Sequence, residues 1–176
     1  MGNPFYLQEV PVDAPFCNRK RELKELRVYA EGKANVVLFS PRRYGKTSLV
    51  RRVQKDLVDK GAVGIFADFF GVASVDDVAS RLAKAVFVMT HRQDPLWKSA
   101  LRAMKSFRPV LKPDPSGGIS LSVEPSGATK GGLQLLEETL DSLREFVAAA
   151  KSLVHTALDE FQEIVTLRRP CRLKAL

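Results

Sequence analysis

Residues 40–47 combine the residue types that bind a phosphate group. They read Ser-Pro-Arg-Arg-Tyr-Gly-Lys-Thr, and Ser48 follows. Walker A motifs, written G-x-x-x-x-G-K-[ST], gather backbone N–H groups and a helix amino terminus around a phosphate. In this segment Gly45 lets the backbone approach closely, Lys46 supplies charge for the β- and γ-phosphates, and the Thr47 hydroxyl can ligate magnesium. The segment therefore predicts a nucleotide-binding loop.

The loop departs from the motif at its first position, where Ser40 replaces glycine. A positive φ there would cost serine about 1 kcal/mol. Gly-Lys-Thr alone is weak evidence, but a strand-like apolar run ends at Phe39 and a helical pattern starts at Lys46, as the motif requires. The alternative interpretation is a turn followed by a capped basic helix. The candidate nucleotide-binding residues are Ser40, Pro41, Arg42, Arg43, Tyr44, Gly45, Lys46, Thr47 and Ser48.

Two adjacent carboxylates, Asp159 and Glu160, follow an apolar run at 152–158. A phosphate loop requires an acidic metal ligand at the carboxyl end of another parallel strand. We expect Asp159 to hold Mg2+ together with Thr47, and Glu160 to polarise the attacking water as a general base. Lys46 and Glu160 are thus the candidate catalytic residues. The same dipeptide also suits an ordinary helix start, because acidic residues are favoured in the first turn.

Composition limits the class of protein. The chain has 176 residues, 45% of them apolar, which suits one globular domain and excludes a disordered chain. Two cysteines, Cys17 and Cys171, are too few for a disulfide scaffold or a zinc cluster and fit a reducing compartment. No apolar run approaches the roughly 18–20 residues that span a bilayer, and no secretory signal begins the chain. We expect a cytoplasmic protein without membrane association.

The hydrophobic pattern alternates strands and helices. Buried-type strands are expected at 35–39, 62–69 and 152–158, helices at 19–30, 46–59, from 74–77 onward and at 130–150, and a β-hairpin near 108–124. This order predicts an α/β fold with βαβ units and a parallel sheet. In the last long helix, a stripe is expected to face the core rather than form a coiled-coil seam, because it lasts barely two heptads. The stripe consists of Leu133, Leu136, Leu140, Leu143 and Val147.

Four segments together resemble the archaeal and bacterial P-loop ATPases of the AAA+/STAND type, relatives of origin-recognition ATPases. They are Asn-Pro-Phe at 3–5, Phe16 with Asn-Arg-Lys-Arg-Glu-Leu at 18–23, the loop at 40–49, and Leu-Asp-Glu-Phe-Gln-Glu-Ile at 158–164. The resemblance covers residues 3–165. It implies a three-layer P-loop NTPase sheet flanked by helices, with the hairpin as an insertion. It also implies ATP as the nucleotide, with residues 16–23 near the adenine.

Relatives of this kind continue with a sensor strand, an arginine region and a helical lid, and these do not follow here. We expect three parts: an irregular lead-in at 1–18, a partial P-loop ATPase core at 19–165 and an aperiodic basic tail at 166–176. In such a sheet the sensor strand lies between the phosphate-loop strand and the Asp-Glu strand. Without it, the two strands would leave backbone groups unpaired. A truncation or a shifted reading frame is the hypothesis for this ending.

The leading functional interpretation is ATP binding with weak hydrolysis. A nucleic-acid-binding module is the alternative, because the net charge is +8 and a basic run ends at Lys55. The only aromatic residue in that run is Tyr44, so it offers no evident stacking platform. A non-functional truncated fragment and a small-molecule kinase are further alternatives. The sequence leaves the oligomeric state open. The basic run comprises Arg42, Arg43, Lys46, Arg51, Arg52 and Lys55.

Overall fold

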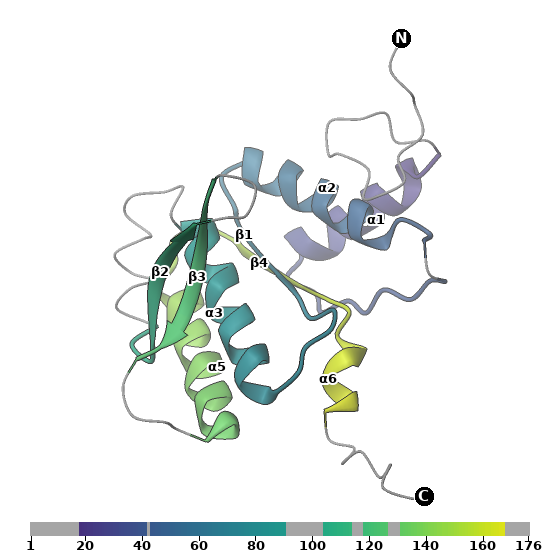
Figure 1. The fold of residues 1–176 in the computed structure, drawn as a ribbon. Helices are drawn as coiled ribbons and strands as arrows, with labels where there is room; N and C mark the ends of the chain where they lie inside the picture. Colours follow the sequence, from purple (N-terminus) through teal and green to yellow (C-terminus); the bar gives the residue numbers. More distant parts are fainter. Residues whose placement is uncertain (1–17, 42, 91–103, 114–117, 127–130, 168–176) are drawn as a thin grey trace, which may run out of the picture. The chain divides into compact units, whose positions relative to one another are not determined.

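A computed structural model describes residues 18–41, 43–90, 104–113, 118–126 and 131–167 (Figure 1). The fold is mixed α/β, with a small parallel sheet and helices. The chain divides into two compact units, residues 1–64 and 65–176. Most of the predicted lead-in and of the basic tail lies outside the described residues. No helix in the described ranges has both the length and the apolar character needed to cross a bilayer.

The first unit is built around two helices, α1 (Lys20–Glu31) and α2 (Lys46–Asp59), which pack against each other. Arg27 pairs with Asp56 across them, and Lys60 Nζ lies 2.9 Å from Glu31 Oε1. Such partly exposed pairs contribute about 0–1 kcal/mol each. The buried apolar residues of α2, Leu49, Val53 and Leu57, are four residues apart and form one face, and Ser48 and Gln54 are buried beside them.

Two glycines allow the chain to turn from α2 into the first strand. Gly61 has a φ of 92° and ends the helix as predicted, with its N–H donated to the Val58 carbonyl at 2.9 Å. A Cβ on Gly64 would lie 2.7 Å from Gln54 Cγ. The absent side chain at residue 64 therefore leaves room for the buried Gln54 of α2 beside the start of the strand.

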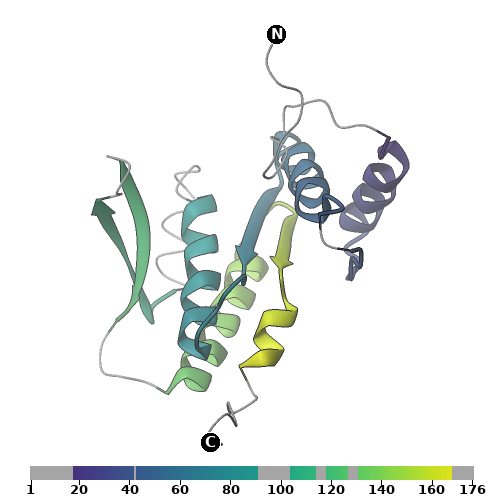
Figure 2. The ribbon, with the colours of Figure 1, turned by 45° about the vertical axis from the view of Figure 1, so that its right-hand side comes forward.

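Strands β1 (Val63–Asp68) and β4 (Val154–Asp159) form the two-stranded parallel sheet (Figure 2). The Phe69 N–H donates to the Asp159 carbonyl at 3.1 Å, which continues the pairing beyond β1. The strand predicted at 152–158 is thus confirmed, but the prediction that it is buried is wrong. Every residue of β4 is half-buried or exposed, because β1 is its only partner strand within the described ranges.

Helix α3 (Val75–Thr90) begins at the predicted cap. The Asp77 N–H donates to Ser74 Oγ at 3.1 Å, and Asp77 Oδ2 accepts the Ala73 N–H at 3.3 Å. Arg81 then joins α3 to the end of β1, because its Nη1 donates to the carbonyls of Asp68 and Phe70. The predicted inner face is confirmed, since Val78, Leu82, Ala85 and Val86 are all buried.

Helix α3 packs against α5 (Gly132–Ala149) and against the hairpin of β2 (Phe107–Pro113) and β3 (Ile119–Pro125). The hairpin strands pair antiparallel with Arg108 opposite Glu124, which confirms the predicted hairpin. Hydrogen bonds from Lys112 and Arg108 lower the pKa of the Glu124 carboxyl. The core of this unit is rich in large apolar side chains: Phe69, Leu82, Val86, Phe87, Met104, Phe107, Leu135 and Phe146.

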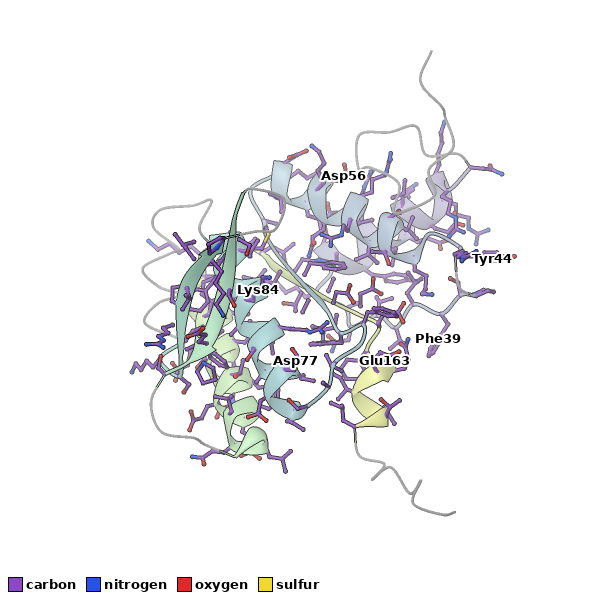
Figure 3. All side chains as sticks on the ribbon, in the orientation of Figure 1. Phe39, Tyr44, Asp56, Asp77, Lys84 and Glu163 are labelled. Carbon is purple, nitrogen blue, oxygen red and sulfur yellow. The ribbon has the colours of Figure 1, made fainter. Side chains whose placement is uncertain are left out.

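The strand predicted at 35–39 does not form, so this expectation was wrong. Residues 34–41 are irregular in the structure, and the side chains of Val37 and Phe39 are 77% and 88% exposed (Figure 3). A buried strand needs neighbours that satisfy its backbone N–H and C=O groups. Among the described residues no strand pairs with this segment. Its apolar composition therefore did not suffice to make it a strand.

The expected orientation of α5 was also wrong. Leu133, Leu140 and Val147 are 64%, 50% and 41% exposed. The buried face of the helix consists of Leu135, Thr139 and Phe146 instead. The inward face includes the polar Thr139, whose Oγ1 donates to the Leu135 carbonyl at 2.6 Å and so satisfies its buried hydroxyl.

We predict that Phe146→Ala lowers the free energy of unfolding of the second unit by about 3–5 kcal/mol. Phe146 is 1% exposed, so its removal leaves a cavity. Phe70→Ala is the matched control, because Phe70 is 63% exposed and its loss should change stability by about 0.5 kcal/mol or less. Urea denaturation followed by circular dichroism measures both variants. Equal stabilities for the two would contradict the packing described here.

Candidate functional site

The loop at 40–48 leads directly into α2. Within its described part, the left-handed residues are Arg43 and Gly45, with φ of 64° and 71°. Ser40 is not left-handed, so the strain considered for serine does not arise. The non-helical backbone of this loop ends at Gly45, where the Gly45 carbonyl accepts the Leu49 N–H at 2.9 Å. Arg42 lies outside the described residues.

Two hydrogen bonds close this loop. Lys46 reaches back to its start, and its Nζ donates to the Ser40 carbonyl at 3.2 Å. Arg19, the N-cap of α1, donates from Nη2 to the Tyr44 carbonyl at 2.6 Å. From the sequence, Arg19 is expected to start the first helix and, by the resemblance, to lie near the adenine. Its contact with the loop joins residues 25 positions apart, and no local pattern predicts such a pair.

The start of α2 has the properties of an anion site. Its N-cap is Gly45, which has no side chain to cap the first N–H groups, and its first turn contains no acidic residue. The positive end of the helix dipole is therefore not offset within the helix. A Cβ at Gly45 would meet no atom within 4 Å, so open space lies beside the loop. Backbone donors, a helix dipole and the Lys46 ammonium fit a phosphate group.

The other loop residues differ in their exposure. Pro41, Arg43 and Tyr44 are exposed, and the Tyr44 side chain reaches 58%. Thr47 is half-buried and Ser48 is buried, and each already has an interaction partner within the structure. The predicted nucleotide-binding residues 43–48 thus lie together at the turn into α2. Ser40 is connected to them by the hydrogen bond from Lys46 Nζ to its carbonyl.

The predicted acidic pair lies at the carboxyl end of β4. Asp159 is the last residue of the strand, and its Oδ1 accepts the Glu160 N–H at 3.0 Å. The short helix α6 (Gln162–Thr166) starts only after Phe161. The pair therefore ends a strand and lies directly before Phe161, the N-cap of α6, so its position fits both the strand-end and the helix-start interpretation.

Glu160 has a left-handed backbone with a φ of 50°. A non-glycine residue in this conformation costs of order 1 kcal/mol and is uncommon outside functional turns. Gln162 Nε2 donates to Glu160 Oε2, and the Glu160 carbonyl accepts the Glu163 N–H at 2.9 Å. Phe161 packs edge-on against Phe69, with ring centroids 6.4 Å apart. These contacts hold the Glu160 carboxylate at the tip of the strand.

The two halves of the predicted site belong to different units, with Thr47 in the first and Asp159 and Glu160 in the second. The structure describes each half separately. Across the described ranges, no group of three or more His, Cys, Asp or Glu side chains is placed to hold a metal ion. The predicted magnesium ligands are Thr47 and Asp159, which include only one carboxylate. The absence of a group of three acidic, histidine or cysteine side chains from the described ranges therefore does not test this site.

His155 lies on β4, and burial lowers the pKa of its imidazole below the ordinary value of 6.5. It is half-buried and has a partner in the structure. Burial thus favours the neutral imidazole, which suits a residue packed within the unit.

The basic run of α2 is already engaged. Arg51 and Arg52 are half-buried and have partners within the structure, and Lys55 Nζ pairs with Asp59 Oδ2 at 3.0 Å. Nucleic-acid affinity depends on cations that can neutralise external phosphates.

Comparison of the chain with protein-family models, with curated proteins and with solved structures finds no match.

We predict that Gly45→Ala destabilises the protein by about 1–2 kcal/mol more than Gly131→Ala. Both glycines are helix N-caps, and a Cβ at either would meet no atom within 4 Å. They differ in backbone, since φ is 71° at Gly45 and −63° at Gly131. Urea denaturation of the two variants measures the difference. Equal losses would show that residue 45 does not need a left-handed backbone.

Proposed function

We propose that this chain binds ATP through residues 40–48 and hydrolyses it weakly with Mg2+. The observation that carries the proposal is the closed loop at the start of α2, with a left-handed Gly45 and with Lys46 bonded to the Ser40 carbonyl. That partner is a neutral oxygen, so the ammonium charge is not cancelled within the loop. A polyphosphate is the ligand that best matches a lysine beside a helix amino terminus that has no side-chain cap.

We further infer that β1, β4 and their helices belong to a P-loop NTPase sheet flanked by helices, although residues 35–39, which would form the strand before the loop, are irregular in the structure. The order helix α2, strand β1, helix α3 and later strand β4, with β1 and β4 parallel, supports this inference. The acidic pair at the end of β4 matches the position such a sheet reserves for the metal ligand and the general base.

The proposal gives each residue a role. Lys46 binds the β- and γ-phosphates, and Thr47 and Asp159 would hold the magnesium ion. When bound, that ion neutralises charge on the phosphate oxygens. Glu160 accepts a proton from the attacking water, and ATP and water become ADP and inorganic phosphate. The Gln162 amide, which donates to Glu160 Oε2, orients the carboxylate for that task.

We predict that Mg-ATP raises the melting temperature of the purified chain and that Lys46→Ala removes this shift. A ligand at 100 times its dissociation constant stabilises the native state by about 2.7 kcal/mol. Lys60→Ala is the matched control, because Lys60 lies at the opposite end of the same helix and pairs with Glu31. Its ATP-induced shift should equal that of the unmodified protein. An undiminished shift in Lys46→Ala would overturn the proposed binding site.

We predict that Glu160→Gln retains the ATP-induced shift but lowers single-turnover hydrolysis by about 10²–10⁴-fold, since an amide cannot accept the proton. Glu163→Gln is the control, because Glu163 lies three residues further along, in the first turn of α6. Rapid-quench detection of labelled phosphate measures turnover. Loss of activity in both variants, or in neither, would argue against Glu160 as the base.

A further inference from the structure

Helix α5 carries a second apolar face that its own unit leaves exposed. We define the α5 seam as Leu133, Leu136, Leu140, Leu143 and Val147. Leu133, Leu140 and Val147 are 64%, 50% and 41% exposed, and the other two are half-buried. At 3.6 residues per turn, the seam lies roughly 100° around the helix from the face that Leu135, Thr139 and Phe146 bury. The seam is thus distinct from the core face.

The spacing of the seam is that of a helix-pairing surface. Its members alternate three and four residues apart, which is the a/d repeat of a coiled coil. The helix has 18 residues, so the seam runs along most of a rod about 27 Å long. Because α3 and the core already hold α5 in place, the seam does not need to stabilise the helix itself.

The charges beside the seam indicate which occupant fits it. Glu137 and Arg144 are both exposed and flank the seam on the side away from the core. They are seven residues apart and so occupy the same heptad position, e. In an antiparallel pair of identical helices, each e position faces the e position of the other copy. Glu137 of each copy would then lie beside Arg144 of the other copy, which gives two pairs of opposite charge.

A parallel pair does not offer this match. There, e positions face g positions of the other helix, and the g positions here include Thr139 and Phe146. Both are buried in the core of their own unit. The seam is also nearly symmetric about Leu140, with Leu133 and Val147 seven residues to either side. A two-fold contact requires such a self-complementary surface.

We propose that two copies of this chain associate through the α5 seam in an antiparallel, two-fold helix pair. The seam is short, so the association is reversible and the dimer fraction rises with protein concentration. The inference is independent of nucleotide binding, because every seam residue belongs to the second unit and none belongs to the phosphate loop.

The test is sedimentation velocity of the full chain over a wide concentration range, without nucleotide. We expect a monomer–dimer equilibrium that Leu140→Glu shifts to monomer at every concentration. Leu111→Glu is the matched control, since Leu111 is an exposed leucine of the same unit, 69% accessible on β2. It should dimerise like the unmodified protein. A strictly monomeric unmodified chain, or equal effects of both variants, would overturn the proposal.

Charge exchange tests the antiparallel arrangement. Glu137→Arg alone and Arg144→Glu alone place like charges opposite each other, so each should raise the dissociation constant several-fold. The double variant should restore it. Failure of the double variant to recover would overturn the antiparallel pairing.

A thermal melt at low protein concentration tests whether residues of the same chain cover the α5 seam. Leu140→Glu should melt like the unmodified monomer, because Leu140 is half exposed. A large concentration-independent destabilisation would mean that residues of the same chain cover the seam, and this would overturn the dimer.

Discussion

The pairing of β1 with β4 is the contact that places the acidic pair within the second unit. It joins segments far apart in the chain, and the bond from the Phe69 N–H to the Asp159 carbonyl extends it to the acidic pair. Arg81 connects the end of β1 to α3, and α3 in turn packs against α5 and the hairpin. The position of Asp159 and Glu160 at a strand end therefore follows from one ladder of backbone hydrogen bonds.

The same requirement for backbone partners explains where the apolar pattern misleads. The segment 35–39 is as apolar as β1, yet it remains irregular and exposed because no described strand pairs with it. β4 pairs on one side and is only partly buried. Apolar composition favours a strand, but hydrogen-bond partners decide whether the strand exists and how deeply it is buried.

The loop at 40–48 depends on fewer and more local contacts than the sheet does. Its left-handed Gly45, the uncapped start of α2 and the Lys46 bond to Ser40 all fall within seven consecutive residues. Arg19 adds one distant support through the Tyr44 carbonyl. Because these contacts are local, we expect the loop to form when α2 forms. The amino terminus of α2 then positions the residues that we propose to bind phosphate.

The sequence by itself determined the local structures. It predicted α2 with its bounds, the Gly61 stop, the Ser74 cap, the buried face of α3, the hairpin, and the acidic pair at the end of a strand. Caps, turn glycines and helical periodicity are encoded by residues a few positions apart, and neighbours alone satisfy them. Only the tertiary structure decided the features that need distant partners. These are the absence of a strand at 35–39, the Arg19 contact with the loop, and the inward face of α5, where Phe146 rather than the leucine stripe fills the core.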